Sequence, residues 1–205
     1  MEFYEVIEKR KSIRDFADKK PDQEKVNKIL ETGIKAPSYN HKREWDFLLI
    51  NDLQNRLKII EAEGIDGKIT TSGMKSLLAS EDEYMIEMYL DAVPKQKRML
   101  LEAPELLMVV YEPKTKVSAS RNVYDLNCLA SAWCCIENIL LAITAEGLYG
   151  VTYIPQETER LKKEFQIPED LEIAALIPFG YKSEEAKIIK QNDVNLNDKI
   201  HFEKW

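Results

Sequence analysis

The longest apolar stretch of the chain, residues 126–148, places the strongest constraint on how this sequence can fold. It also contains four amide or charged side chains, at Asn127, Glu137, Asn138 and Glu146. Because such groups are costly inside a lipid bilayer, we predict a buried helix of a soluble protein rather than a membrane span. The pattern places this helix at about residues 122–146, with Gly147 ending it. Since it is apolar on nearly every face, we expect it to be covered on several sides.

All three cysteines fall inside this same stretch, at Cys128, Cys134 and Cys135. Two adjacent cysteines on a helix point apart and three cannot all pair, which argues against a disulfide framework. Their spacing matches no zinc motif, and only His41 and His201 could add imidazole ligands, so we predict no metal site. We interpret the cysteines as reduced thiols that act as small apolar side chains. Together with an N-terminus that lacks a basic and apolar leader, this favours a cytoplasmic location.

The chain as a whole has the size and composition of one globular domain. Its 205 residues can bury a sizeable core, and no repeat, low-complexity stretch or Gly/Ser linker divides them. We therefore expect a single domain over residues 1–205. The formal net charge of −7 argues against a broad nucleic-acid-binding surface.

The order of the expected elements indicates the fold class. Apolar periodicity predicts helices at about 3–10, 22–34, 53–63 and 157–165, in addition to the long helix. Short apolar runs predict strands at 45–50, 106–111, 151–154 and 172–181. Two helices precede the first strand, and helices and strands alternate unevenly afterwards. This order predicts an α+β layer fold rather than a regular doubly wound sheet.

Two regions do not fit that core. Residues 64–102 form a polar excursion rich in Lys, Glu and Met, punctuated by Gly64, Gly67, Gly73 and Pro94. This excursion could cover a ligand site with Met74, Tyr84, Met85 and Met88, or it could simply pack on the core. The C-terminal extension, residues 182–205, is polar but ends with the apolar side chains of Ile200, Phe202 and Trp205. These need a surface to cover them, which either a second subunit or the chain's own domain could provide.

Two polar runs carry the chemistry. The first segment follows the opening helix and reads Arg10-Lys11-Ser12-Ile13-Arg14-Asp15-Phe16. Two arginines that flank a hydroxyl group can offer several charged hydrogen bonds to one phosphate, although a short basic run is otherwise most often solvated surface.

The second segment precedes the strand expected at 45–50 and reads Ala36-Pro37-Ser38-Tyr39-Asn40-His41. It continues as Lys42-Arg43-Glu44-Trp45. Polar side chains directly before a buried strand often line a ligand site, and an ordinary helix-to-strand loop is the alternative.

Together, the two segments resemble the FMN-dependent nitroreductase family. The family pattern R-x-S-x-R-x-F is matched by Arg10, Ser12, Arg14 and Phe16. The second pattern, A-P-S-x-x-N-x-Q-P-W, is matched by Ala36, Pro37, Ser38 and Trp45. The resemblance continues through the long helix, Gly150 and the run IPFGY at 177–181, and so covers most of the chain apart from 64–102.

The resemblance implies an α+β fold with a mixed sheet flanked by helices, in which two chains intertwine and hold FMN between them. The first segment would bind the phosphate and ribityl chain through Arg10, Lys11, Ser12 and Arg14. The second segment of the other chain would lie along the isoalloxazine ring with Pro37, Ser38, Tyr39, Asn40 and His41. The family's asparagine would be replaced by His41 if the segments align without a gap, or would correspond to Asn40 with one. The loop after the long helix would add Thr152, Tyr153 and Ile154, and either Lys187 or Lys190 would complete the phosphate site.

The activity implied by the resemblance is reduction of small organic acceptors, such as nitroaromatics or quinones, by NAD(P)H through flavin N5. The cofactor carries this chemistry, so no protein nucleophile or general base is expected. Two alternatives stay open. One is a flavin-dependent reductive dehalogenase or dehydrogenase with a narrow substrate, since His41 is similar to a feature of related dehalogenases. The other is a flavin-binding protein without turnover.

Overall fold

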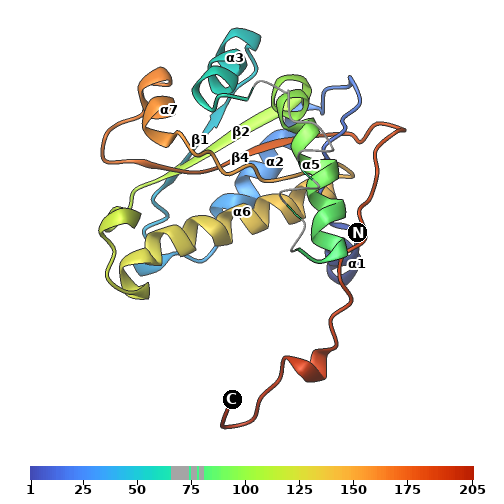
Figure 1. Cartoon of the computed structure of the whole chain (residues 1–205). Helices are drawn as coiled ribbons and strands as arrows, with labels where there is room; N and C mark the ends of the chain where they lie inside the picture. The colour runs from blue at the N-terminus through green and yellow to red at the C-terminus, as the bar shows by residue number, and fades with distance from the viewer. Residues whose placement is uncertain (66–73, 75–77, 79–80) are drawn as a thin grey trace.

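The computed structural model describes residues 1–65, 74, 78 and 81–205. Its centre is a four-stranded sheet in the order β1-β2-β4-β3 (Figure 1). The strands are β1 (Trp45–Leu49), β2 (Glu105–Tyr111), β3 (Tyr149–Gly150) and β4 (Glu172–Gly180). Neighbouring strands all run antiparallel. The expectation of a mixed sheet is therefore wrong for these four strands. Within the described residues, parallel pairing occurs as an isolated bridge between Ser12 and Gly150.

Helices cover both faces of this sheet. One face carries α2 (Gln23–Ile34) and α6 (Asn127–Ala145), while the other carries α3 (Leu53–Ala62), α5 (Glu83–Glu102) and α7 (Thr158–Glu164). Side chains of β2 alternate between the two resulting cores, because successive residues of a strand point to opposite faces. Leu107, Val109 and Tyr111 enter the α2/α6 core. Leu106, Met108 and Val110 enter the α3/α5/α7 core. The α+β layer fold is confirmed.

The long apolar helix is shorter than expected and only partly covered. A 3-10 turn (Val123–Leu126) precedes α6, and the Asn122 side chain accepts a hydrogen bond from the Asp125 backbone N–H within that turn. Residues 123–145 are long and apolar enough to cross a membrane by length and composition, yet one face of α6 lies in the sheet core. Trp133 is 38% exposed. Within a single chain, α6 is therefore buried on one side, whereas burial on several sides was expected.

The C-terminal half of the excursion forms α5. The buried side chains of Met99 and Leu100 show that the C-terminal half of α5 packs on the core, which is one of the two alternatives expected for the excursion. Pro94, which was expected to punctuate the middle of the excursion, lies inside this helix and does not divide it. Proline removes one backbone donor from the helix, and Pro94 itself lies at an exposed position of α5. Gly67 and Gly73 lie outside the described residues.

The termini of the elements mostly lie where the sequence predicts them. The first helix, α1 (Phe3–Lys9), ends at Lys9, with Arg10 as its C-cap. The exceptions are α6, which begins at Asn127 rather than near residue 122, and β3, which covers residues 149–150 rather than 151–154. After β3, the Val151 backbone N–H donates to the Pro178 carbonyl at 3.3 Å, and Tyr153 forms an isolated bridge with Leu176.

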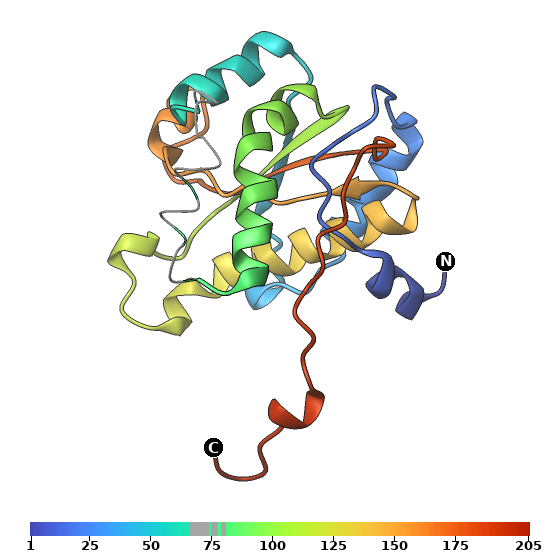
Figure 2. The same ribbon diagram turned by 45° about the vertical axis from the view of Figure 1, so that its right-hand side comes forward.

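The C-terminal extension consists of two different stretches. Its first half runs beside α5 and the first segment, whereas the end projects away from the body of the molecule (Figures 1 and 2). In that projecting end, Phe202 is 85% exposed and Trp205 is fully exposed. Of the two expectations for this extension, packing of its apolar end on its own domain is not what the structure shows.

Candidate functional site

The first segment lies at the edge of the sheet. Ser12 pairs with Gly150, Phe16 pairs with Lys182, and the Ala17 backbone N–H donates to the Tyr181 carbonyl at 2.9 Å. Ile13 is completely buried, and it anchors the extended chain at this position. Because side chains of an extended chain alternate, Ser12 and Arg14 project to the opposite side.

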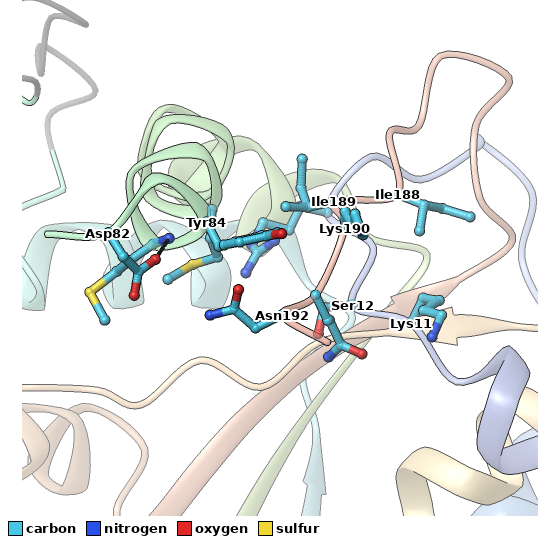
Figure 3. Close-up of a pocket in the computed structure, with 12 residues that line it drawn as sticks. Lys11, Ser12, Asp82, Tyr84, Ile188, Ile189, Lys190 and Asn192 are labelled. Carbon is cyan, nitrogen blue, oxygen red and sulfur yellow. Dashed lines mark hydrogen bonds between the residues drawn. The ribbon is translucent and has the colours of Figure 1, made fainter. Parts of the chain in front are cut away.

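A cavity of about 300 Å³ opens on that side. Figure 3 shows that its side chains come from three separate parts of the chain: the first segment, the N-terminal half of α5, and the extension near residue 190. Its cationic lining consists of Lys11, Arg14 and Lys190, next to the hydroxyl of Ser12. Its apolar lining consists of Tyr84, Met85, Met88, Ile188 and Ile189. The structure thus brings together a set of hydrogen-bond donors that suits a phosphate and an apolar wall.

The structure also distinguishes between the basic residues that the sequence proposed for this site. Lys190 lines the cavity, whereas Lys187 lines a neighbouring cavity together with Asp15 and Asp91. Arg10 is the C-cap of α1 and does not belong to the described lining. Tyr84, Met85 and Met88, which the sequence singled out as one use of the excursion, do line it, while buried Met74 does not.

Arg14 is a largely enclosed cation of the lining. Its side chain is 12% exposed, and its Nη1 lies 3.6 Å from Oδ2 of Asp91 on α5. Burial lowers the pKa of Arg14, and the negative charge of Asp91 opposes that shift. An arginine keeps its charge in proteins even so, and its guanidinium presents five N–H donors.

The second segment lies elsewhere, at the N-terminal end of α6. The Tyr39 backbone N–H donates to Oγ of Ser131 at 2.9 Å, and the hydroxyls of Tyr39 and Tyr124 lie 2.7 Å apart. Asn40 and His41 adopt left-handed backbone conformations, with φ of 52° and 55°. Such conformations are uncommon for residues other than glycine and often occur at functional sites.

Within one chain, the two segments do not meet. Ser131, beside the second segment, and Ala145, next to the β3 edge that holds Ser12, are separated by fourteen residues of α6. At 1.5 Å per residue this is about 20 Å along the helix. The predicted residues Pro37, Ser38, Tyr39, Asn40 and His41 are therefore not brought to the cavity of their own chain.

The loop after β3 is held by contacts with β4 and with Glu63 at the end of α3. Tyr153 exchanges two backbone hydrogen bonds with Leu176, at 2.7 and 2.8 Å, and its hydroxyl donates to Glu63 at 2.7 Å. Burial and the adjacent Glu63 raise the pKa of Tyr153. Its phenol is thus held by the Glu63 carboxylate, and both Tyr153 and Ile154, which is 46% exposed, line a third cavity. Thr152 is half-buried.

Glu63 is a residue that the sequence reasoning missed. Its carboxylate also accepts hydrogen bonds from the backbone N–H groups of Gln156 and Glu157, both at 2.9 Å. About ninety residues separate these partners along the chain, so no local pattern signals the contact. Asp91 was missed for the same reason, although its spacing from Lys95 is that of a helical ion pair.

Comparisons with known proteins identify the family of this chain. The model of the nitroreductase family matches residues 7–181. An iodotyrosine deiodinase of Haliscomenobacter hydrossis is 27% identical over 190 residues, which cover 91% of this chain and 82% of that protein. A protein of Archaeoglobus fulgidus whose name contains the words NAD(P)H nitroreductase is 26% identical over 211 residues, covering 100% of this chain and 99% of that one.

A similar fold occurs in the crystal structure of an oxidized iodotyrosine deiodinase bound to FMN and 3-iodo-L-tyrosine. The two structures superimpose with a TM-score of 0.75 at 23% identity, and each chain is covered completely. The family match spans the first segment, the second segment and all four strands, and the chain therefore belongs to the nitroreductase family of flavin oxidoreductases.

Proposed function

We propose that this protein is a homodimer that binds FMN between its subunits and uses NAD(P)H to reduce small organic acceptors, such as nitroaromatics or quinones. The observation that carries the proposal is the cavity that gathers Lys11, Ser12, Arg14 and Lys190 beside apolar side chains of α5. Charged donors of this kind suit a phosphate, and the apolar wall suits a flat organic group.

The cavity of one chain accounts for part of such a site. Its volume of about 300 Å³ lies at the low end of the range for ligand pockets, which is about 300–1,000 Å³. We assign Arg14, Ser12, Lys11 and Lys190 to the phosphate end. The second segment, which lies about 20 Å away along α6, would come from the partner and lie along the ring.

Three features support the dimer. The outer side of α6 leaves Trp133 38% exposed, and Phe3 of α1 is 63% exposed. A groove between α1, α2 and α6 is lined by the apolar side chains of Phe3, Leu141, Ala142 and Ala145, next to the polar side chains of Lys28, Thr32, Asn138 and Glu146. The projecting C-terminal end carries Phe202 and Trp205. A symmetric pair, in which the same surface of each chain faces its mate, would cover all three.

When bound, the flavin supplies the hydride-transfer chemistry through N5, so the protein has to bind, orient and shield rather than provide a nucleophile. Arg14 places a fixed positive charge at the site. Tyr84 and Met88 form an apolar wall that excludes water from one side. Ser12 and Lys190 offer donors that hold an anionic group against the sheet edge.

A second candidate activity is reductive dehalogenation of a halogenated phenol. The relative from Haliscomenobacter hydrossis is named for it, and this chain has His41 in the second segment. In this reaction, two electrons and a proton replace the carbon–halogen bond by carbon–hydrogen and release halide. Release of iodide from 3-iodo-L-tyrosine by the reduced protein would distinguish this activity from quinone reduction.

Purification followed by flavin analysis tests the main proposal. We expect a yellow protein that releases one FMN per chain on denaturation and oxidises NAD(P)H when a quinone or nitroaromatic is added. A yellow protein without turnover would favour a flavin-binding role. A colourless protein that does not take up added FMN would overturn the proposal.

A further inference from the structure

One face of α5 carries charges that cross to the first segment. Asp91, Lys95 and Arg98 are spaced so that they lie on the same side of the helix. Nζ of Lys95 donates to Oδ2 of Asp15 at 2.6 Å, and Lys95 also pairs with Asp91. Arg98 pairs with Asp15, while Arg14 faces Asp91 at 3.6 Å. The consecutive residues 14 and 15 are thus both matched by opposite charges on α5.

The inner part of this network is sheltered from solvent. The exposed fraction of the side chain is 9% for Asp15, 10% for Asp91 and 12% for Arg14. Ion pairs of this kind are screened less than surface pairs, and removing one partner leaves the other charge buried without compensation. The position of the Arg14 guanidinium therefore depends on Asp91.

The contact leaves Arg14 able to bind an anion. A separation of 3.6 Å between Nη1 and Oδ2 is longer than a hydrogen bond, so Asp91 attracts the guanidinium without consuming one of its donors at optimal geometry. Lys95 pairs with the same carboxylate and offsets the repulsion that Asp91 would exert on a phosphate. Arg14 itself lines the cavity with Lys11 and Ser12.

We propose that Asp91 is a positioning residue, which holds the Arg14 guanidinium at the phosphate end of the flavin site. This inference rests on the proposed function, because it takes Arg14 to contact the phosphate of FMN. It also makes α5 part of the cofactor site, so the C-terminal half of the excursion cannot be removed without affecting the first segment.

Flavin binding to apoprotein variants tests this role, with FMN and riboflavin as the two ligands, since riboflavin lacks the phosphate. We expect Asp91→Asn to weaken FMN binding by about fivefold or more, as contacting residues are typically coupled to this extent or further. Riboflavin binding should stay within about twofold of the wild-type value. Glu87→Gln is the matched control, because it removes the same charge from α5 one turn earlier, at a side chain that lines the neighbouring cavity. It should leave both affinities unchanged.

The double variant Arg14→Ala/Asp91→Asn separates positioning from a general structural effect. If Asp91 acts through Arg14, then Asp91→Asn causes no additional loss of FMN binding in the Arg14→Ala background. An unchanged or tighter FMN affinity in Asp91→Asn, an equal loss of riboflavin binding, or the same loss in the Arg14→Ala background would overturn the inference.

Two further results keep the inference separate from folding and from the proposed function. Should Asp91→Asn not fold, Asp91→Glu retains the charge but moves the carboxylate by one methylene. A loss confined to FMN supports positioning, and no loss or a loss shared with riboflavin contradicts it. If Arg14→Ala binds FMN as the wild type does, the phosphate site of the proposed function fails, and the role of Asp91 fails with it. If Arg14→Ala weakens binding but Asp91→Asn does not, only the positioning role fails.

Discussion

The two segments that the sequence assigns to one cofactor are built in different ways. The first is extended and paired with the sheet edge, and Ile13 anchors it in complete burial while Arg14 and Asp15 pair with α5. The second is a half-exposed loop at the far end of α6, with left-handed residues at Asn40 and His41. The first region thus has its backbone and the Arg14 side chain held by contacts within one chain, while Ser12 and Lys190 remain exposed. The second presents its groups outward, which is what a surface completed by a partner requires.

The largest effect should come from separating the two chains. Replacing exposed Trp133 on α6 with glutamate introduces a charge into the proposed interface. We expect the dissociation constant of the dimer to rise by at least about 30-fold, since tryptophans buried in an interface commonly contribute about 2 kcal/mol or more to binding. Sedimentation of the FMN-loaded protein measures this. Leu53→Glu, on the opposite face of the sheet and 55% exposed, is the control. A Trp133→Glu dimer as stable as the control would remove α6 from the interface.

The next effect concerns the first segment alone. Arg14→Ala should weaken FMN binding by about 10-fold to 100-fold, because hydrogen bonds to charged groups contribute roughly 1.5–3 kcal/mol. Binding of riboflavin should change little. Ser38→Ala in the second segment should affect both ligands alike, because that segment would contact the ring rather than the phosphate. Fluorescence titration provides all four affinities, and equal losses for FMN and riboflavin in Arg14→Ala would contradict the assignment.

A smaller effect distinguishes the two lysines of the extension. Lys190 lines the cavity but is also solvent-exposed and paired with Asp193 at 3.2 Å. Lys190→Gln should therefore weaken FMN binding by only about twofold to fivefold, and the difference should shrink as salt is added. Lys187→Gln should have no such effect, because Lys187 faces Asp15 and Asp91 in the neighbouring cavity. Equal effects of the two substitutions would make the extension a general electrostatic contributor.

The smallest effect lies within the second region, at the tyrosine pair. The hydrogen bond with Tyr39 and the charge of Lys114, whose Nζ lies 3.4 Å from the ring centroid, lower the pKa of Tyr124. The pKa of Tyr39 is raised by the same hydrogen bond. A lowered pKa means that the folded state favours the phenolate, so any stabilisation exists above the ordinary tyrosine pKa and is lost as pH falls through the lowered value.

Ultraviolet titration of tyrosinate checks this expectation. One tyrosine should ionise below the ordinary value of about 10, and this early phase should disappear in Tyr124→Phe. Lys114→Gln should move the phase to higher pH, whereas Lys116→Gln in the same loop should not. Identical titrations of Tyr124→Phe and the wild type would show that the pair does not shift the ionisation.

The elements that local pattern decides were predictable from the sequence. The short apolar runs at β1, β2 and β4 specify strands and the long apolar stretch at α6 specifies a helix, because length separates the two when periodicity does not. The sequence singled out the first segment, and three of the four residues proposed there to bind FMN line the cavity, namely Lys11, Ser12 and Arg14. The membership of Tyr84, Met85 and Met88 in the lining was one of two expectations for the excursion.

The features that depend on distant contacts could not be predicted. Arg14 meets Asp91 across about eighty residues, and Glu63 meets Tyr153 across about ninety, so neither pair leaves a local pattern. Pro94 was expected to punctuate the excursion, yet α5 continues through it. The relative direction of the strands depends on the path of the chain between them. The antiparallel pairing of β3 with β4 therefore could not be predicted from the residues of the two strands alone.

Subunit mixing tests the central claim most directly, namely that each flavin site takes its first segment from one chain and its second from the other. Arg14→Ala is defective in the first segment, and Asn40→Val is designed to distort the second, because a β-branched residue is disfavoured at a φ of 52°. In a mixed dimer, one composite site has both defects and the other has none. When the two variants are unfolded together and refolded, random pairing should restore FMN binding to about one quarter of all sites. Arg14→Ala refolded alone, in which every site carries the defect of the first segment, should restore none. Restoration near one quarter is the result that the account predicts, and no restoration in the mixture, while the wild type refolds and binds FMN, would contradict it.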